Sequence, residues 1–254
     1  GIGTDTLNAT IATTATPGGM ANVENLNTTF TAAVTLNATN MTGMTSISNI
    51  GSTNAGTISN LEGTAAAVTI ADNAVGATFA YKAAALTGTA DSLAVTFSNV
   101  TAGTTTITGA IETLNITSSG SANTVALVAS ATTLNVSGDQ DITLSGTGTT
   151  GAATINAASA TGDVGMTSNA AASTAVTLTG GSGDDSITLT GGNTATDTVS
   201  GGAGDDTITF TADLADADIV DGGAGTDTLV GTTANLRGLT TANNVSNIEV
   251  IQVS

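Results

Sequence analysis

The sequence contains no cysteine and no histidine. The first absence excludes a disulfide framework and a thiolate nucleophile, and the second removes the commonest general base of enzymes. Only Lys82 and Arg237 carry a positive charge, and neither lies within the main cluster of aspartates. Nucleophile–base chemistry, and lyase chemistry that needs a basic proton acceptor, are therefore disfavoured. We expect no catalytic residue and no enzyme activity.

The two basic residues face twenty acidic ones, which gives a formal net charge of −18. Such a charge repels the phosphates of nucleic acids and anionic lipid headgroups, so nucleic acid is not an expected partner. No apolar run approaches the roughly 20 residues that a membrane-spanning helix needs, and no membrane insertion is expected. The charge should attract cations instead.

Aromatic residues and proline are also scarce, with four phenylalanines, one tyrosine and a single proline. Glycine occurs 32 times, and threonine, alanine, asparagine and serine fill most of the remainder. This composition cannot supply a bulky aromatic core. It suits a solenoid, in which each thin coil contributes a few small aliphatic side chains and is covered by its neighbours.

Three nine-residue phrases recur at a fixed interval of 21 residues in the C-terminal half of the chain. They span Gly180–Thr188, Gly201–Thr209 and Gly222–Val230, and all fit the pattern G-G-x-G-x-D-x-U-x, in which U is a large aliphatic residue. This pattern is typical of calcium-binding parallel β-helices. Alternatively, the phrases could be ordinary glycine-rich turns whose aspartates face solvent. Three copies at one period favour calcium binding over this alternative.

The residue types in the phrase suit calcium chemistry. Glycine allows positive φ and lets backbone carbonyl oxygens approach an ion. The sixth residue, which is Asp185, Asp206 or Asp227, stands where the turn runs into a strand. If the coils stack in register, these carboxylates lie about 4.8 Å apart, where they repel by roughly 1 kcal/mol per pair even in water. Because Ca²⁺ takes six to eight carboxylate and carbonyl oxygens, we predict several Ca²⁺ ions between the coils.

Other acids extend this candidate site. The fifth residue of the first two phrases is also an aspartate, Asp184 and Asp205, and should point to the opposite face of its strand from the sixth. A weaker acidic edge is formed by Asp197, in the phrase 192–200, and by Asp218. The chain opens on Gly1–Asn8, which matches 223–230 at six of eight positions and adds Asp5.

The hydrophobic pattern predicts an all-β chain. Short runs that alternate small polar with aliphatic residues, bounded by glycine, asparagine or aspartate, indicate strands and turns. From about residue 110, two families of aliphatic residues recur at steps near 21, so each coil should contain two strands. We therefore predict a right-handed parallel β-helix or β-roll solenoid with about 21 residues per coil, and no helix.

Along this single continuous solenoid we distinguish loosely periodic coils (1–109), regular coils (110–179), calcium-binding coils (180–230) and a closing strand unit (231–254). The glutamates at 24, 62, 112 and 249 are interpreted as solvated acids beside ordinary strands, in preference to the alternative of a metal role. Because the opening and closing phrases match, and because the chain starts partway through a nonapeptide, we expect it to be a piece of a longer protein.

The three phrases resemble those of the repeats-in-toxin (RTX) family, which is exported by type I secretion. The threonine-, alanine- and asparagine-rich sequence around them, such as Ile111–Ile116 and Leu134–Asp139, further resembles that of RTX-type bacterial surface-layer proteins. The resemblance implies a secreted, extracellular solenoid on the cell surface whose ions are held by the sixth aspartate and by glycine carbonyls. The carbonyl donors implied on this chain are those of Gly181, Gly183, Gly202, Gly204, Gly223 and Gly225.

Two functions follow from this resemblance. The first is a structural surface-layer segment that folds and assembles with copies of itself into a lattice on binding Ca²⁺, with cell-surface lipopolysaccharide contacted through other parts of the parent protein. The alternative is a calcium-stiffened repeat region of a giant RTX adhesin, whose purpose would be recognition of a surface ligand.

Overall fold

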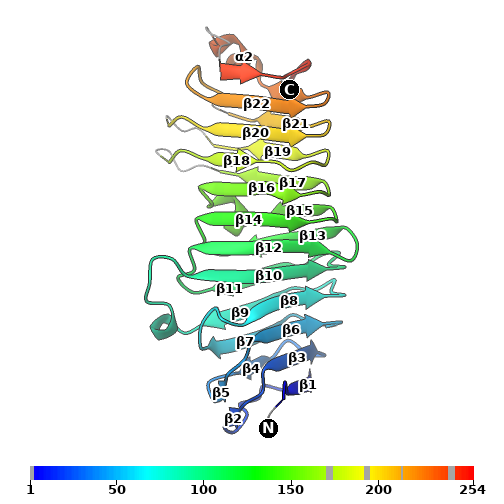
Figure 1. Ribbon diagram of the computed structural model, residues 1–254, viewed down its shortest axis with the longest axis vertical. Coiled ribbons are helices and arrows are strands. Elements are labelled where there is room, and N and C mark those ends of the chain that lie inside the picture. Colours follow the sequence, from blue (N-terminus) through cyan, green and yellow to red (C-terminus); the bar gives the residue numbers. More distant parts are fainter. Residues whose placement is uncertain (1–2, 170–173, 192–194, 213, 240–243) are drawn as a thin grey trace. The chain divides into compact units, whose positions relative to one another are not determined.

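A computed structural model of the chain describes residues 3–169, 174–191, 195–212, 214–239 and 244–254. The chain divides into two compact units, Gly1–Ala131 and Thr132–Ser254. Both are built from coils that place parallel strands on two sheets, with neighbouring coils roughly 21 residues apart (Figure 1). The predicted all-β parallel solenoid is thereby confirmed.

In the first unit, two sheets and a short strand pair make up the coils. The first sheet has the strand order β1 (Thr6–Ile11), β3 (Asn25–Phe30), β6 (Ser46–Ile50), β8 (Ala67–Ala71), β10 (Ser92–Ser98) and β12 (Thr113–Ser119). The second has the order β4 (Thr35–Asn37), β7 (Gly56–Leu61), β9 (Ala77–Tyr81), β11 (Thr104–Thr108) and β13 (Asn123–Val128). The pair is β2 (Met20–Ala21) with β5 (Met41–Thr42).

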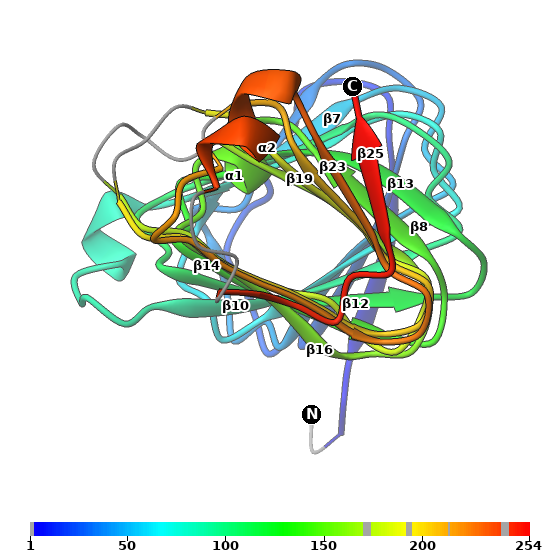
Figure 2. The same cartoon turned by 90° about the horizontal axis from the view of Figure 1, so that it is seen from above.

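The second unit repeats this plan with shorter strands. One sheet has the order β14 (Thr133–Gly138), β16 (Thr154–Ala160), β18 (Thr177–Thr179), β20 (Thr198–Ala203), β22 (Ile219–Ala224) and β24 (Val245–Ser246). The other has the order β15 (Ile142–Ser145), β17 (Val164–Ser168), β19 (Ser186–Leu189), β21 (Thr207–Phe210), β23 (Thr228–Gly231) and β25 (Val250–Val253). Seen along the stack, the turns of this unit overlie one another (Figure 2).

The core of the second unit consists of aliphatic columns that run through the coils. On one sheet, residues in register are Leu134, Ile155, Leu178, Val199 and Val220. On the other they are Leu144, Met166, Ile187, Ile208 and Leu229. All ten are buried, and strand alternation leaves threonine and serine on the outer faces. These are the two aliphatic families that the sequence predicts.

In the first unit, the period is more regular than the sequence indicates. Leu26, Ile47 and Val68 are in register on consecutive coils. The next coil is longer because it carries a loop with a 3₁₀ helix, η1 (Ala83–Ala85), after which Val95 pairs with Val68. The inserted loop, rather than a loss of stacking, breaks the apparent repeat.

Buried amide and hydroxyl groups connect the coils of the first unit. The Asn73 Oδ1 accepts the backbone N–H of Ser52 at 2.7 Å, and the Asn123 Oδ1 accepts that of Val100 at 2.8 Å. The Asn123 Nδ2 also donates to Ser118 Oγ at 2.8 Å and to nearby backbone carbonyls. A buried asparagine can thus satisfy a backbone N–H of the preceding coil without a charge.

The prediction that the chain has no helix is wrong in detail. Besides η1, the structure contains α1 (Thr147–Thr150) and α2 (Thr233–Gly238). At the start of α2, the Thr232 Oγ1 accepts the Asn235 backbone N–H at 3.2 Å. Elements of four to six residues are too short to show a helical period, so sequence patterning misses them. None of the described helices has the length and apolar character to cross a membrane.

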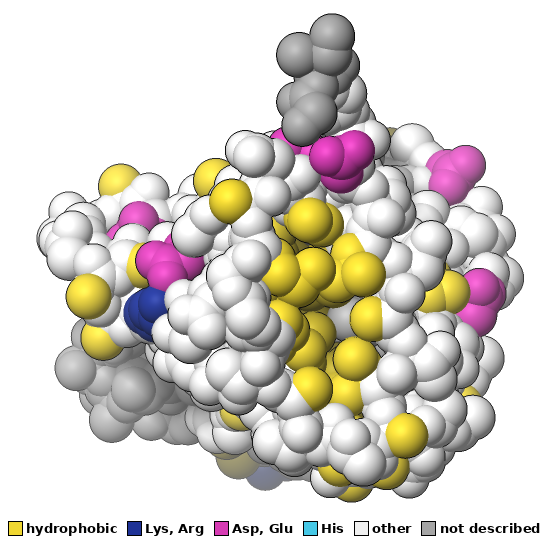
Figure 3. All heavy atoms as spheres, turned by 90° about the horizontal axis from the view of Figure 1, so that it is seen from below, with side chains coloured by type: hydrophobic (Ala, Val, Ile, Leu, Met, Phe, Trp, Pro, Cys, Tyr) yellow, Lys and Arg dark blue, Asp and Glu magenta, His cyan; other side chains and the backbone are white. Residues whose placement is uncertain are grey.

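At the face of the first unit that carries β1 and β2, apolar side chains lie in a hollow framed by uncharged atoms (Figure 3). A cavity of about 190 Å³ in this unit is lined by Met41, Met44, Ile47 and Leu61 among others. The lining contains a single titratable side chain, Glu62, whose carboxylate forms an ion pair with Lys82. The cavity therefore offers no pair of catalytic groups.

Candidate metal centre

A column of buried carboxylates runs through the second unit at the edge where the glycine-rich turns lie. Asp185, Asp206 and Asp227 immediately precede β19, β21 and β23, and their relative exposures are 2%, 1% and 0%. Each aspartate and the aliphatic residue two positions later share the inner face of the coil. The structure thus places all three side chains inside the stack, aligned on consecutive coils.

Each carboxylate in the column holds the backbone of the preceding coil. The Asp185 Oδ1 accepts the Val164 N–H at 2.7 Å. The Asp206 Oδ1 accepts the Asp185 N–H, and the Asp227 Oδ1 accepts the Asp206 N–H, both at 2.8 Å. The donor and acceptor residues are 21 positions apart in every case. This repeat of one contact explains why the sequence interval is fixed.

The second oxygens of these carboxylates are not equally satisfied. The Asp185 Oδ2 accepts the Gly181 N–H at 2.5 Å. The Oδ2 atoms of Asp206 and Asp227 are buried and have no hydrogen-bond partner within the described parts of the chain. A buried carboxylate oxygen without a partner costs several kcal/mol in order of magnitude, unless a proton or a cation compensates its charge.

Carbonyl oxygens lie beside these unpartnered atoms. A Cβ added to Gly201 would lie 2.2 Å from Asp206 Oδ2 and 2.3 Å from the Gly222 carbonyl oxygen. A Cβ added to Gly222 would lie 2.6 Å from Asp227 Oδ2 and 1.8 Å from the Asn247 carbonyl oxygen. Each carboxylate oxygen therefore has another hydrogen-bond acceptor as a near neighbour. A carboxylate oxygen and a carbonyl oxygen of this kind can form part of the ligand set of a hard cation such as Ca²⁺.

The electrostatics of the column point in the same direction. Burial, together with the neighbouring carboxylates of Asp185 and Asp227, raises the pKa of Asp206 from its ordinary value to about 7. Burial also raises the pKa of Asp185, against the lowering effect of its backbone hydrogen bonds. Without a cation, Asp206 holds its charge poorly at neutral pH.

The predicted carbonyl donors are packed against the backbone of the preceding coil. Gly202 and Gly223 have φ of 115° and 109°, and Gly204 and Gly225 have φ of 118° and 146°. A Cβ on Gly223 would lie 2.0 Å from the Gly202 carbonyl oxygen, and one on Gly204 would lie 2.2 Å from that of Gly183. Glycine is thus required here by positive φ and by coil-to-coil packing, whatever the carbonyls bind.

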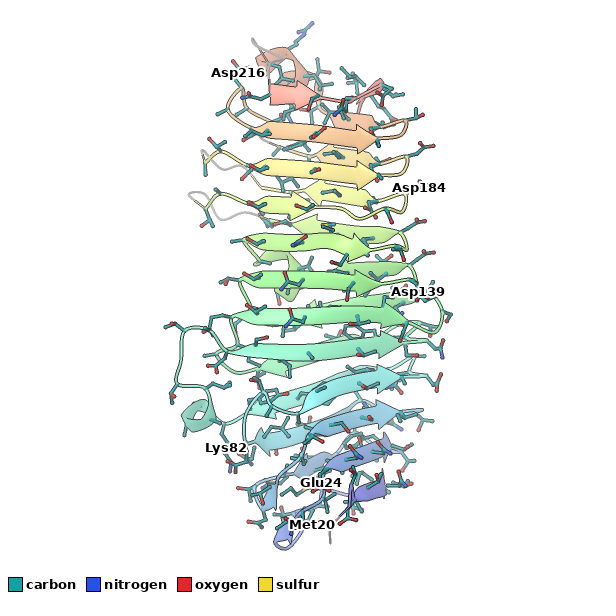
Figure 4. All side chains as sticks on the ribbon, viewed as in Figure 1. Met20, Glu24, Lys82, Asp139, Asp184 and Asp216 are labelled. Carbon is teal, nitrogen blue, oxygen red and sulfur yellow. The ribbon has the colours of Figure 1, made fainter. Side chains whose placement is uncertain are left out.

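A second row of acids lies outside the same turns and is exposed. The Asp184 N–H donates to Asp163 Oδ1, and the Asp205 N–H donates to Asp184 Oδ1, both at 2.8 Å. The Asp163 N–H donates to Asp141 Oδ1 at 3.0 Å. Figure 4 shows Asp184 projecting from this edge of the second unit. Sequence reasoning missed Asp141 and Asp163, although their spacing from Asp184 follows the coil period.

The other predicted acids do not join the buried column. Asp197 and Asp218 are 2% exposed and lie on the opposite edge of the coils, before β20 and β22. The Asp218 Oδ1 accepts the Asp197 N–H at 2.9 Å, and its Oδ2 accepts the Ala215 N–H at 2.8 Å. The phrase 192–200 that contains Asp197 begins with residues outside those described. Asp5 is exposed and lies in the first unit, in register with Glu24.

Three of the glutamates accept hydrogen bonds from the backbone of the preceding coil, which the sequence did not indicate. The Oε2 atoms of Glu24, Glu112 and Glu249 accept the backbone N–H groups of Asp5, Asp91 and Asp227 respectively, each at 2.8 Å. These glutamates therefore hold neighbouring coils together instead of only facing solvent. Glu249 continues the column of Asp185, Asp206 and Asp227 by one more carboxylate.

The residues present fit Ca²⁺ in their chemistry, with one restriction. Among the described residues, no three acidic, histidine or cysteine side chains gather closely enough to hold a metal by themselves. An ion in the column would therefore take part of its ligands from backbone carbonyls, which Ca²⁺ accepts. Comparison of the chain with models of known protein families, with curated proteins and with solved structures finds no match.

Proposed function

We propose that this chain is a structural, calcium-binding segment of an extracellular surface layer. In this proposal Ca²⁺ binds along the column of Asp185, Asp206 and Asp227 and stabilises the second unit. The bound ions supply the positive charge that the column lacks, since the chain contains only two basic residues. The segment does not catalyse a reaction; its function is to form a stiff, regular scaffold.

One observation carries this proposal. The Oδ2 atoms of Asp206 and Asp227 are buried and, within the described residues, unpartnered. The first unit shows that a charge is not needed to cap a backbone N–H in this fold, because Asn123 does so with its amide oxygen and satisfies its Nδ2 with three further hydrogen bonds. The presence of aspartate instead of asparagine in the second unit therefore requires an explanation, and a cation bound beside Oδ2 provides one.

Binding and folding are coupled in this scheme. The carboxylates converge only when consecutive coils are stacked, so the site does not exist in the unfolded chain and the binding free energy contributes to folding. Where free calcium is scarce, repulsion between the acids keeps the second unit loose. Where calcium is plentiful, as outside the cell, the ions bind and the coils fold into the stacked structure. This behaviour suits a chain that is exported unfolded and folds at the surface.

The lattice role depends on self-association of the folded segment. Solenoid coils with exposed threonine and serine on both sheet faces offer broad, regular surfaces, and copies of the chain are the partners we propose. Contacts with lipopolysaccharide would come from other parts of the parent protein. A calcium-stiffened adhesin repeat would share the fold and the ions but would not form ordered sheets.

The test has two steps. In the first, Ca²⁺ is titrated into the chelator-treated chain while circular dichroism follows β-structure and thermal unfolding. We expect a calcium-dependent gain of β-signal and a higher unfolding temperature, with Mg²⁺ as the weaker control ion. The proposal would be refuted if the second unit were fully folded in chelator and its unfolding temperature did not change with Ca²⁺. In the second, electron microscopy with and without calcium distinguishes sheets from single filaments or monomers.

A further inference from the structure

The buried column does not end at Asp227. In the register of β23 and β25, the residue that follows Asp227 on the next coil is Glu249, which directly precedes Val250. The Asp227 backbone N–H donates to Glu249 Oε2 at 2.8 Å. The same contact joins Asp206 to Asp227 and Asp185 to Asp206. Glu249 is therefore a fourth member of the column, although it belongs to no glycine-rich phrase.

Among the described residues, several oxygen atoms without a hydrogen-bond donor belong to the turns that contain Asp227 and Glu249. The Asp227 side chain is 0% exposed, and its Oδ2 has no hydrogen-bond partner in the described residues. The Asn247 carbonyl oxygen lies beside that atom, because both would contact a Cβ placed on Gly222 at 2.6 and 1.8 Å. The Glu249 Oε1 makes no hydrogen bond to any described residue, and this side chain is exposed to solvent. Two of these oxygens are thus neighbours at Gly222, and the third belongs to the carboxylate that holds the Asp227 N–H.

Asn247 takes the place of a glycine at the last turn. Its carbonyl lies beside Asp227 Oδ2, as the Gly222 carbonyl lies beside Asp206 Oδ2 one coil earlier. Its φ is 51°, a left-handed value that asparagine and aspartate tolerate better than most residues, whereas Gly222 does not have a positive φ. The carbonyl keeps its place although the residue and its backbone conformation differ, and a glutamate replaces the aspartate.

The construction is repeated in the first unit, which argues against an accident of the last coil. Asp91 donates its N–H to Glu112 Oε2 at 2.8 Å, and the Asp91 carbonyl accepts from the N–H groups of Glu112 and Thr113 at 3.1 Å. The Asp227 carbonyl likewise accepts from Glu249 and Val250, at 3.1 and 2.9 Å. In both pairs the aspartate Oδ2 is buried without a partner within the described chain.

We infer that Glu249 is a cation ligand, and that it binds one divalent cation together with the Asp227 carboxylate and the Asn247 carbonyl. The site shares Asp227 with the third glycine-rich phrase and differs from the others because its second carboxylate is exposed and comes from a glutamate outside the phrases. The inference rests on the proposed calcium-binding function and extends it to the coil after the final phrase. Ca²⁺ is the expected ion, since it accepts carboxylate, carbonyl and water oxygens in flexible geometry.

Isothermal titration of Ca²⁺ into the 254-residue chain tests this inference with two matched variants. Glu249→Gln keeps an oxygen that can accept the Asp227 N–H but removes the negative charge. Glu24→Gln makes the same change in the first unit, where the partner Asp5 is exposed. We expect Glu249→Gln to bind one ion fewer, or to bind one ion at least about 10-fold more weakly, and Glu24→Gln to match the wild type.

The outcomes separate this inference from the function on which it rests. If the wild type binds no Ca²⁺, both fail. If the wild type binds Ca²⁺ and Glu249→Gln has the same stoichiometry and affinity, only the role of Glu249 is refuted. Should Glu249→Gln fail to fold, hydrogen exchange on the wild type decides: Ca²⁺ must slow exchange of the Asp227 amide, and an unchanged rate at that amide overturns the inference.

Discussion

The backbone N–H of Asp185 donates to Oδ1 of Asp206 at 2.8 Å, so one oxygen of the more buried acid is committed to holding the preceding coil. Its other oxygen, Oδ2, lies beside the Gly222 carbonyl without a partner among the described residues. The two halves of one carboxylate thus have separate tasks. The first is structural and could be performed by an amide, whereas the second requires a proton or a cation.

Replacing Asp206 by asparagine tests this division. Asp206→Asn keeps the acceptor for the Asp185 N–H and places an amide donor beside the Gly222 carbonyl. In chelator we expect the variant to be more stable than the wild type by about 1–3 kcal/mol, because a buried charge is replaced by a hydrogen bond. With Ca²⁺ the order should reverse. Thermal unfolding followed by circular dichroism measures both, and a variant that still gains full calcium stabilisation would contradict the division.

The reciprocal exchange in the first unit should have the opposite effect. Asn123→Asp keeps the oxygen that accepts the Val100 N–H but removes the Nδ2 donor, so a carboxylate oxygen would face the acceptors at Ser118, Ser119 and Ser121. We expect a loss of about 3 kcal/mol or more at neutral pH, from a buried and uncompensated charge. Urea unfolding measures the loss, and Asn123→Ser serves as an uncharged control.

The calcium-free chain should become more stable as the pH falls from 8 towards 5. The folded-state pKa of Asp206 is raised to about 7, whereas an aspartate in the unfolded chain titrates near 4. Its contribution to stability is therefore fully present below about pH 4 and is lost as the pH rises through about 7, with a size on the order of a few kcal/mol. Unfolding midpoints in chelator check the trend, and Asp206→Asn should flatten it.

Glycine packing gives a prediction that does not depend on metal. Gly201→Ala would bring a methyl group to 2.2 Å from Asp206 Oδ2 and 2.3 Å from the Gly222 carbonyl oxygen. We expect this variant to lose about 1–3 kcal/mol or more, both with calcium and in chelator, because the neighbouring coil cannot move away without breaking the ladder. Gly19→Ala, which has nothing within 4 Å of the added carbon, is the matched control and should be neutral in denaturant titrations.

Calcium should protect the two units unequally. The buried aspartate column lies in the second unit, whereas the first unit closes comparable turns with asparagine amides. Hydrogen exchange in chelator should therefore show faster opening of the amides of Asp185, Asp206 and Asp227 than of Val100, and Ca²⁺ should reduce the difference. Equal protection of both units in chelator would show that the column needs no ion to remain closed.

The sequence predicted the fold because its strongest signals are local and periodic. An aliphatic residue such as Ile187 or Ile208 recurs at the coil period and faces inward, which fixes two strands per coil and their register. The loop with η1 shifted the period in the first unit and concealed a stack that is otherwise regular. Short helices such as α2 were not predicted, because they contain too few residues to show a helical period in the sequence.

The candidate site was less accessible from sequence. The period identified Asp206 and Asp227, but it could not show that one carboxylate oxygen holds the previous coil while the other is unpartnered. Glu249 was interpreted as a solvated acid because it lies beside strand-like aliphatic residues, and only the backbone register aligns it with Asp227. By contrast, the sequence did assign Asp197 and Asp218 to an acidic edge separate from that of Asp185, and they lie on the opposite edge of the coils.

The backbone contacts made by Asp185, Asp206 and Asp227 repeat from one coil to the next. A duplication of the segment from Gly201 to Asp221 would therefore add a turn whose aspartate and aliphatic residues meet the same kinds of neighbour above and below. Lengthening by whole coils of this kind requires no new type of contact between coils.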